Sequence, residues 1–373
     1  MKSIFNLEDH GGGVMPYGYK SGIIDFSANI NPVGLSKKAA KIFKYPGRLK
    51  YFTENYPEIY PESFIKILSD YHSTDKKCIF PGAGAADLLF NTVCMLNPNK
   101  IIIVEPSFLE YERAASLRTE KSDIIHINTY FSDNFELKGE SLSNLLENIK
   151  KLDKNDLIFI ATPSNPAGAV TPLNTIIKIL ELAKTKKALL VLDESFMDFC
   201  EEFSSKFLIA EGGRFDNLII IRSMTKFFAM PGQRLGYILA SHKIIKKFAE
   251  YSAPWKITSL ASEIALESLK DRDYITKSRI LLNGLKKNLL TELKKLKFLE
   301  IIPGKANFFL LKIKTPSPKT FNALDLKNSL HESGILIRYC GYYRGLDDKY
   351  FRIAVRKKYE NDFLIKKLKE IIF

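Results

Sequence analysis

The chain has 373 residues, of which 46% are hydrophobic and 26% are charged, a balance typical of a globular protein large enough for two domains. Its net charge of +14 could indicate nucleic acid, but the lysines alternate with leucines in helical stretches, and no groove-reading motif accompanies them. The four cysteines have no metal-binding spacing, and the sequence has neither a secretory signal nor an apolar run approaching the ~18 residues of a membrane span. We therefore expect a cytoplasmic protein without a metal site, a nucleic-acid partner or a membrane partner.

Short apolar runs alternate with helical patterns in the first two thirds of the chain. The predicted strands are residues 78–80, 101–105, 157–162, 188–193, 218–223 and 236–240. The predicted helices between them are residues 86–96, 108–117 and 175–185. Strands that are apolar on both faces and separated by helices indicate an α/β fold with a mainly parallel sheet covered on both sides. Ligands of such sheets bind beyond the carboxyl ends of the strands.

The pattern changes after about residue 250. Two or three long helical segments precede three apolar runs and a last helix, at residues 308–313, 335–340, 350–355 and 362–373. This order predicts a smaller α+β domain at the C-terminus. We expect an N-terminal arm of residues 1–40 that packs with the small domain, a large domain of residues 41–250 and a small domain of residues 251–373.

Several residues of types that bind ligands or take part in catalysis fall at the ends of the predicted strands. The small residues Gly82 to Ala86 join a strand to a helix, a turn that lets backbone N–H groups approach a phosphate. Asn165 follows the strand at 157–162, and Asp193 closes the strand at 188–193. Each has a structural alternative, because glycine, asparagine and aspartate also form tight turns and helix caps. The lysine in SMTKFFAMPGQRLGY (223–237) is harder to explain by packing, since apolar residues follow it directly.

This succession resembles the fold-type I enzymes that use pyridoxal phosphate, and the resemblance covers nearly the whole chain. It implies that Lys226 forms the Schiff base with the cofactor aldehyde and later moves protons at the substrate Cα. It implies further that Asp193 binds the pyridine nitrogen, that Asn165 binds the phenolic oxygen and that Phe108 covers the ring. A lysine with this task must be a neutral amine when it acts, which apolar surroundings favour.

The same resemblance assigns the cofactor phosphate and the assembly. The implied phosphate ligands are the Gly84, Ala85 and Ala86 backbone with Ser223, Thr225 and Arg234. The enzymes of this family are homodimers with the site at the interface, and Tyr56 matches a tyrosine that reaches the partner's cofactor phosphate. Without the resemblance, Tyr56 is an aromatic in a turn before a proline.

Two families within this group are nearest: the threonine-phosphate decarboxylases of cobalamin synthesis and the histidinol-phosphate aminotransferases. Both carry two C-terminal arginines, here Arg338 and Arg352, which suit a small phosphorylated amine substrate. The opening His10–Gly11 followed by DFSANINP (25–32) matches the decarboxylases, in which the histidine–glycine pair and the first asparagine, here Asn29, contact the substrate together with Asn165. Phe196 in DESF also matches the decarboxylases, whereas aminotransferases have tyrosine there.

We therefore expect decarboxylation of threonine phosphate to aminopropanol phosphate, the cobalamin linker, or of serine phosphate to ethanolamine phosphate. The two substrates differ by one methyl group, which supports only ~1–3 kcal/mol of discrimination. One alternative is an aminotransferase acting on histidinol phosphate or an aromatic amino acid. Another is a non-catalytic regulator with this fold, which requires an added DNA-binding domain that we do not expect. The loops SNPAG (164–168) and GAGAAD (82–87) depart from the decarboxylase pattern and leave the substrate side open.

Overall fold

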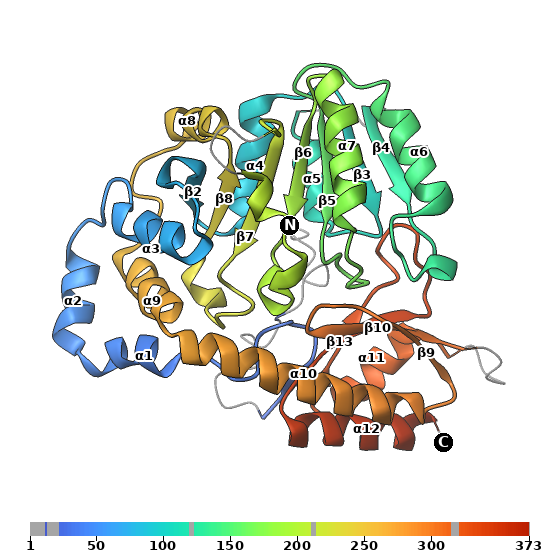
Figure 1. Ribbon diagram of the computed structural model, residues 1–373. Coiled ribbons are helices and arrows are strands. Elements are labelled where there is room, and N and C mark those ends of the chain that lie inside the picture. Colours follow the sequence, from blue (N-terminus) through green and yellow to red (C-terminus); the bar gives the residue numbers. More distant parts are fainter. Residues whose placement is uncertain (1–11, 13–21, 119–122, 210–213, 315–320, 373) are drawn as a thin grey trace, which may run out of the picture.

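The computed structural model describes residues 12, 22–118, 123–209, 214–314 and 321–372. Its central feature is a seven-stranded sheet of order β2-β8-β7-β6-β5-β3-β4 (Figure 1). The strands are β2 (Ile79–Gly82), β3 (Ile101–Glu105), β4 (Ile124–Asn128), β5 (Leu157–Ala161), β6 (Leu189–Asp193), β7 (Leu218–Ser223) and β8 (Gly236–Ala240). The neighbouring strands β4, β3, β5, β6 and β7 are parallel to one another, and β8 is antiparallel to both of its neighbours, β7 and β2. The predicted α/β class with a mainly parallel sheet is confirmed.

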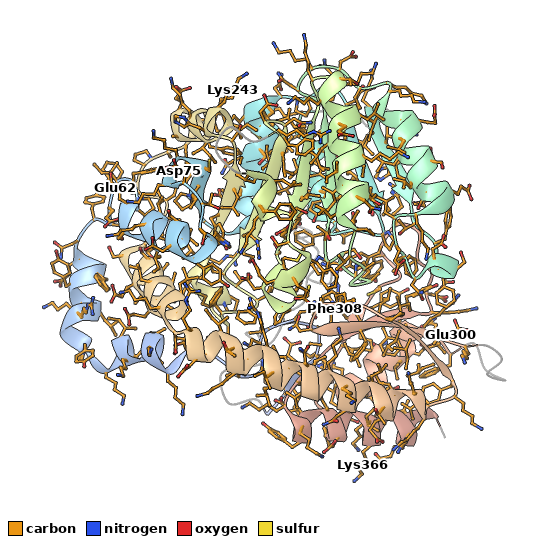
Figure 2. The ribbon with its side chains drawn as sticks, viewed as in Figure 1. Glu62, Asp75, Lys243, Glu300, Phe308 and Lys366 are labelled. Atoms are coloured by element: carbon orange, nitrogen blue, oxygen red, sulfur yellow. The ribbon has the colours of Figure 1, made fainter. Side chains whose placement is uncertain are left out.

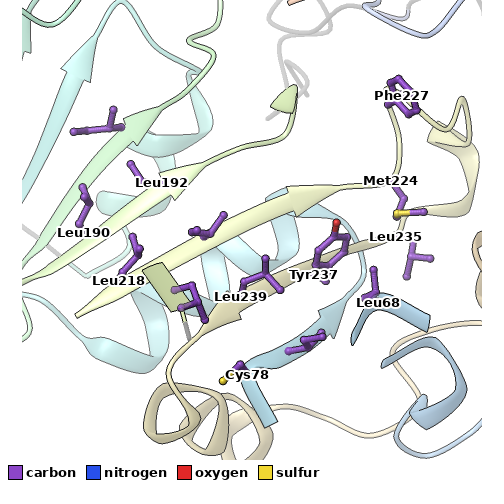
Figure 3. Close-up of a cluster of buried hydrophobic side chains, with 14 of the residues drawn as sticks. Leu68, Cys78, Leu190, Leu192, Leu218, Met224, Phe227, Leu235, Tyr237 and Leu239 are labelled. Carbon is purple, nitrogen blue, oxygen red and sulfur yellow. The ribbon is translucent and has the colours of Figure 1, made fainter. Parts of the chain in front are cut away.

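Helices cover both faces of this sheet because successive residues of each buried strand point to opposite sides. In β6, Leu190 and Leu192 belong to one hydrophobic core, and Leu189 and Val191 belong to the other. The first core also contains side chains of α3 (Glu62–His72), α6 (Gly139–Ile149), α7 (Leu173–Thr185) and α9 (Ser259–Lys270). The second contains side chains of α4 (Ala85–Leu96), α5 (Glu110–Ala115) and α8 (His242–Tyr251). Figure 3 shows part of the first core, with Leu190 and Leu218 on neighbouring strands.

The small domain is built on a second, antiparallel sheet of order β12-β13-β10-β9. Its strands are β9 (Leu299–Ile302), β10 (Phe308–Ile313), β12 (Arg338–Tyr339) and β13 (Tyr350–Ala354). Its helices are α10 (Arg272–Lys294), α11 (Ala323–Glu332) and α12 (Lys358–Ile372). Figure 1 shows this domain below the large sheet, with α10 and α12 along its outer side. Figure 2 labels Phe308 at the junction of the two domains.

The N-terminal segment and α10 connect the two domains. The short strand β1 (Ile24–Asp25) pairs with β11 (Ile335–Leu336) of the small domain, whereas α1 (Lys37–Ala40) and α2 (Pro46–Glu54) pack near α9. Side chains of α9 lie in the core of the large domain, and the small-domain core takes side chains of α10 only from Leu285 onward. The side chains of α10 therefore pass from one core to the other along the helix.

Two features in the middle of the chain were not among the predicted elements. The strand β4 is an edge strand that contains His126 and Asn128, so it lacks the uninterrupted apolar run that identifies its neighbours. The helix α6 follows it and buries only one stripe of side chains. Among the described helices, none combines the length and the low charge that a membrane crossing requires.

Candidate active site

A cavity of about 310 Å³ lies where the carboxyl ends of β5, β6 and β7 face the small domain. This is the edge at which parallel α/β sheets bind ligands. Most of the side chains predicted to form the site line this one cavity: Asn29, Ala85, Ala86, Phe108, Asn165, Asp193, Phe196, Ser223, Thr225, Lys226, Arg234, Arg338 and Arg352. The fold therefore brings together residues that lie more than 300 positions apart in the sequence.

One end of the cavity, at the N-terminus of α4, has the features of an anion-binding site, here called the cradle. Gly84 precedes this helix with φ +102° and ψ 163°, a conformation that is essentially restricted to glycine. A Cβ placed on Gly84 would lie 3.0 Å from Nη2 of Arg234, so the guanidinium covers the turn. The hydroxyls of Ser223 and Thr225 lie 2.8 Å apart on the same lining. Backbone N–H groups at a helix N-terminus, a cation and hydroxyls together suit a phosphate.

Replacing Gly84 with alanine is expected to destabilise the fold by roughly 1–3 kcal/mol and to weaken anion binding, because the Cβ forces strain and displaces Arg234. The measurement is chemical unfolding with and without inorganic phosphate. Gly47 is the matched control, since it lies in α2 and a Cβ added there would meet no atom within 4 Å, so alanine at this position should be neutral or stabilising. Equal effects at the two glycines would contradict the cradle.

The carboxylate of Asp193 faces the cavity from the end of β6. Its Oδ1 accepts a hydrogen bond from the backbone N–H of Ser195 at 2.9 Å, and its Oδ2 accepts one from the hydroxyl of Tyr111 at 2.6 Å. The two hydrogen bonds therefore hold the side chain of Asp193 in one orientation at the cavity wall.

Lys226 lies in the loop after β7, and the N-terminal segment holds this loop in place. The N–H of Asn31 donates to the carbonyl of Lys226 at 3.0 Å, and the side-chain amide of Asn31 donates to the carbonyl of Phe227 at 2.9 Å. The hydroxyl of Tyr274 donates to the same Phe227 carbonyl at 3.0 Å. The apolar residues after the lysine are buried in the large-domain core, so they anchor the loop while the amine points into the cavity.

Burial lowers the pKa of Lys226 to about 8, with further lowering by the charges of Arg352 and Arg234 and opposition from Asp193. The neutral amine is therefore reached near pH 8 instead of the usual value above 10. This is the direction required of a nucleophilic lysine.

In the ligand-free protein, acylation of Lys226 is expected to rise with pH and to reach half its maximum near pH 8, because only the neutral amine reacts. The measurement is competitive labelling with acetic anhydride across the alkaline range, read by mass spectrometry. The exposed Lys243, labelled in Figure 2, is the internal reference. Coincident profiles for the two lysines would contradict the environment described for Lys226.

The opposite wall of the cavity carries two buried arginines. Arg338 and Arg352 are direct partners across β12 and β13, and their exposed fractions are 4% and 5%. Burial, assisted by the charge of Arg338, lowers the pKa of Arg352. Like charges placed opposite each other in a sheet are destabilising. An anion bound between them would relieve this repulsion, so the pair is suited to a substrate with negative charge.

Arg352 also orients Asn165, which lies on the loop after β5. Its Nη1 donates to Oδ1 of Asn165, and its Nη2 donates to the carbonyl of Ser27 at 2.9 Å. Because the amide oxygen of Asn165 is used, its NH₂ group remains a donor toward the cavity. Within the described part of the chain, Nε of Arg352 and Oδ1 of Asn29 are buried without a hydrogen-bond partner, which leaves polar capacity for a ligand.

The remaining predicted site residues are not part of this cavity lining. Tyr56 is 84% exposed, and its ring lies 5.3 Å from that of Trp255 on the outside of the large domain. His10 and Gly11 lie outside the described residues. The neighbouring Gly12 donates its N–H to the hydroxyl of Ser27 at 3.0 Å, and Ser27 lines the cavity.

Some residues of the cavity lining were not predicted from the sequence: Ser27, Ala28, Leu89, Tyr111, Ala161, Pro163, Ser195 and Tyr343. Most of them are small or apolar, and such residue types do not identify a binding site in a sequence. Tyr111 was detectable in principle, because it lies three residues after Phe108, one helical turn away. Tyr343 lies under the guanidinium of Arg338, with 5.5 Å between the guanidinium carbon and the ring centroid.

Comparison with known proteins identifies the family. Residues 21–368 match the family model described as "Aminotransferase class I and II". The chain belongs to this family. It is 29% identical to threonine-phosphate decarboxylase of Salmonella typhimurium over 99% of this chain and 98% of that protein. It is also similar to the crystal structure of histidinol-phosphate aminotransferase from Clostridium acetobutylicum, with a TM-score of 0.82 and 28% identity, covering 93% of this chain and 98% of that one. The crystal structure of L-threonine-O-3-phosphate decarboxylase from Porphyromonas gingivalis is similar with a TM-score of 0.78 and 25% identity, covering 93% of this chain and 98% of that one.

As a class I and II aminotransferase family member, the chain uses pyridoxal phosphate, and the cavity fits this group. The cradle before α4 suits its phosphate, the carboxylate of Asp193 suits its protonated ring nitrogen, and the amine of Lys226 suits its aldehyde. When bound, the cofactor supplies an electron sink for bonds broken at the substrate Cα.

Proposed function

We propose that this enzyme decarboxylates an O-phosphorylated L-amino acid, either threonine phosphate or serine phosphate, to supply the linker of the cobalamin nucleotide loop. The main support is the pair of buried arginines, Arg338 and Arg352, which face the cofactor cavity from directly opposite strand positions. A substrate with both a carboxylate and a phosphate offers two anionic groups to two cations. The similarity to threonine-phosphate decarboxylases supports the same function.

In this proposal the large domain holds the cofactor. Lys226 would form the covalent link, Asp193 would bind the ring nitrogen, and the NH₂ group of Asn165, whose oxygen accepts from Arg352, would donate to the phenolic oxygen. Phe108 and Phe196 are the aromatic residues of the ring pocket. The phosphate is assigned to a separate set of groups: the backbone of Gly84, Ala85 and Ala86 with Ser223, Thr225 and Arg234.

The substrate residues decide which bond at Cα breaks. When bound, the cofactor would accept the electrons of the bond that breaks at the substrate Cα. One arginine of the pair, with Asn29, would bind the substrate carboxylate and orient it for loss as carbon dioxide. The other arginine binds the substrate phosphate, and His10 and Gly11 approach from the N-terminal segment. Lys226 would return a proton to Cα after carbon dioxide has left.

The deciding experiment is release of carbon dioxide from L-threonine phosphate and from L-serine phosphate by the purified, cofactor-loaded enzyme. We expect stoichiometric carbon dioxide together with the amino-alcohol phosphate. The second candidate function is a histidinol-phosphate aminotransferase, favoured by the similarity to the Clostridium acetobutylicum structure. Formation of a keto acid from either phosphorylated amino acid, together with the pyridoxamine form of the cofactor, would refute the decarboxylase. Formation of the corresponding ketone phosphate from histidinol phosphate would establish the aminotransferase.

We further propose that the chain forms a homodimer through the face that carries Tyr56. Several large apolar side chains of residues 43–59 and 251–255 are exposed, and two of these segments meet where the ring of Tyr56 lies 5.3 Å from that of Trp255. The exposed residues are Phe43, Tyr45, Tyr51, Tyr56, Ile59, Tyr251 and Trp255. Exposed apolar patches of this kind indicate a protein–protein interface. Tyr56 would then reach the cofactor phosphate of the partner subunit.

Substitution of both Tyr51 and Ile59 with aspartate is expected to convert the dimer into monomers and to lower cofactor affinity, because a buried unpaired charge opposes association. Sedimentation equilibrium measures the first effect, and cofactor titration measures the second. The control is a double substitution of Ile280 and Leu281, which are exposed on α10, distant in sequence from this face. A wild-type chain that sediments as a monomer would contradict the proposal.

A further inference from the structure

Tyr111 is a buried tyrosine whose hydroxyl contacts the carboxylate of Asp193 in the cavity lining. It lies on α5, its exposed fraction is 2%, and its hydroxyl donates to Oδ2 of Asp193 at 2.6 Å. The cofactor contacts proposed for the large domain do not include it. Its position is fixed independently of Asp193, as its packing shows.

The ring of Tyr111 is held on two sides. It stacks on Phe159 of β5 with an interplanar angle of 11° and a centroid distance of 5.5 Å. It meets the edge of Phe108 at 89° and 5.9 Å, and its backbone N–H donates to the carbonyl of Phe108 at 3.0 Å. The hydroxyl therefore reaches Asp193 from a rigid ring, and the same turn of chain presents Phe108 to the cavity.

The hydroxyl of Tyr111 can only be a donor in this contact. Burial, with the nearby charge of Asp193, raises the pKa of Tyr111 well above its usual range, so the phenol keeps its proton. Ser195 donates to Oδ1 of the same carboxylate. A carboxylate offers about four lone-pair sites, so two donors leave room for the ring nitrogen of the cofactor.

We propose that Tyr111 is a positioning residue that keeps the proton on the cofactor ring nitrogen by stabilising the negative charge of Asp193. The proton shared between a pyridine nitrogen and a carboxylate resides on the nitrogen only if the carboxylate is the weaker base. A hydrogen bond donated to the carboxylate lowers its basicity. Without the hydroxyl of Tyr111, the proton moves toward Asp193, and the ring becomes a poorer acceptor of electrons. This role of Tyr111 requires the bound cofactor and is independent of which substrate is used.

The test is the ¹⁵N resonance of the bound cofactor labelled at its ring nitrogen, in the wild-type holoenzyme and in Tyr111→Phe. In the wild type the resonance should lie near the value of the protonated free cofactor. In Tyr111→Phe it should move toward the unprotonated value, and kcat should fall roughly tenfold, which corresponds to one hydrogen bond to a charged group. The matched control is Tyr237→Phe, a fully buried tyrosine that bonds His72 at 2.6 Å outside the cavity lining, and it should leave the resonance unchanged.

A second replacement preserves the packing. With 3-fluorotyrosine at position 111 the phenol is a stronger acid and a better donor, so the ring nitrogen should become more fully protonated than in the wild type or remain so to higher pH. An unchanged resonance in both Tyr111→Phe and the fluorinated protein would overturn the proposal. Failure of the wild-type chain to bind the cofactor would overturn the cofactor assignment, and the role of Tyr111 with it.

Discussion

Replacing Lys226 with alanine is expected to reduce turnover by roughly 1000-fold or more, because in the proposed function the amine is both the covalent anchor of the cofactor and the proton carrier at Cα. Borohydride reduction should then attach no cofactor to the chain, whereas in the wild type the reduced cofactor should be recovered on the peptide that contains Lys226. The measurements are steady-state kinetics and mass spectrometry of the reduced protein.

Stability should change in the opposite direction to activity. The amine of Lys226 lies close enough to Arg234 and Arg352 for their charges to lower its pKa, so its removal relieves repulsion among buried cations. The cofactor-free Lys226→Ala protein should therefore melt at the same temperature as the wild type or higher. Lys243→Ala, at an exposed position on α8, is the control and should alter neither property. Retained turnover in Lys226→Ala would refute the assigned chemistry.

The second large effect is expected at the arginine pair. Replacing Arg338 with glutamine should lower kcat/KM for the phosphorylated amino acid roughly 30-fold or more. The reason is that this buried arginine would no longer pair with an anionic group of the substrate. Replacing Arg352 should also weaken cofactor binding, because it additionally removes the hydrogen bond that orients Asn165. Kinetics and cofactor titration on the two variants separate these effects.

A nearby arginine provides the control for this experiment. Arg344 belongs to the loop after β12 and pairs with Glu112 at 3.2 Å, but its side chain is 47% exposed. Exposed ion pairs contribute only ~0–1 kcal/mol, so Arg344→Gln should have little effect on kcat/KM. If Arg338→Gln behaves like Arg344→Gln, the substrate anions bind elsewhere and the proposed function loses its main support.

The cavity rests on a buried ionic network whose members could not be paired from the sequence. Arg222 is fully buried directly before Ser223 and forms ion pairs with Glu194, Asp198 and Glu201 at 3.1, 3.5 and 2.9 Å. Burial raises the pKa of Glu194 and of Asp198, whereas Arg222, with further help from Lys206, keeps the pKa of Glu201 low, at about 2. Because Glu194 follows Asp193, the network joins the end of β6 to the end of β7 just behind the cofactor groups.

Secondary structure was predictable where one local signal dominated. The strands at 101–105, 218–223 and 236–240 coincide with their predicted bounds, because continuous apolar runs between turn residues leave few alternatives. The edge strand β4 was missed because its exposed edge tolerates polar residues. The position of α9 could not be deduced either, since its apolar stripe would fit the core of either domain.

The sequence by itself determined the order of chemical groups along the chain: a glycine turn before a helix, an asparagine and an aspartate after strands, and a lysine inside an apolar run. These are local properties, set by residue type and spacing. They predicted the fold class, and their resemblance to the fold-type I enzymes implied the cofactor. Only the tertiary structure decided that Arg352 meets Asn165, 187 residues away, and that Tyr111 meets Asp193, 82 residues away. Such contacts depend on strand order and register, which are fixed by the packing of the whole chain and not by any short segment of it.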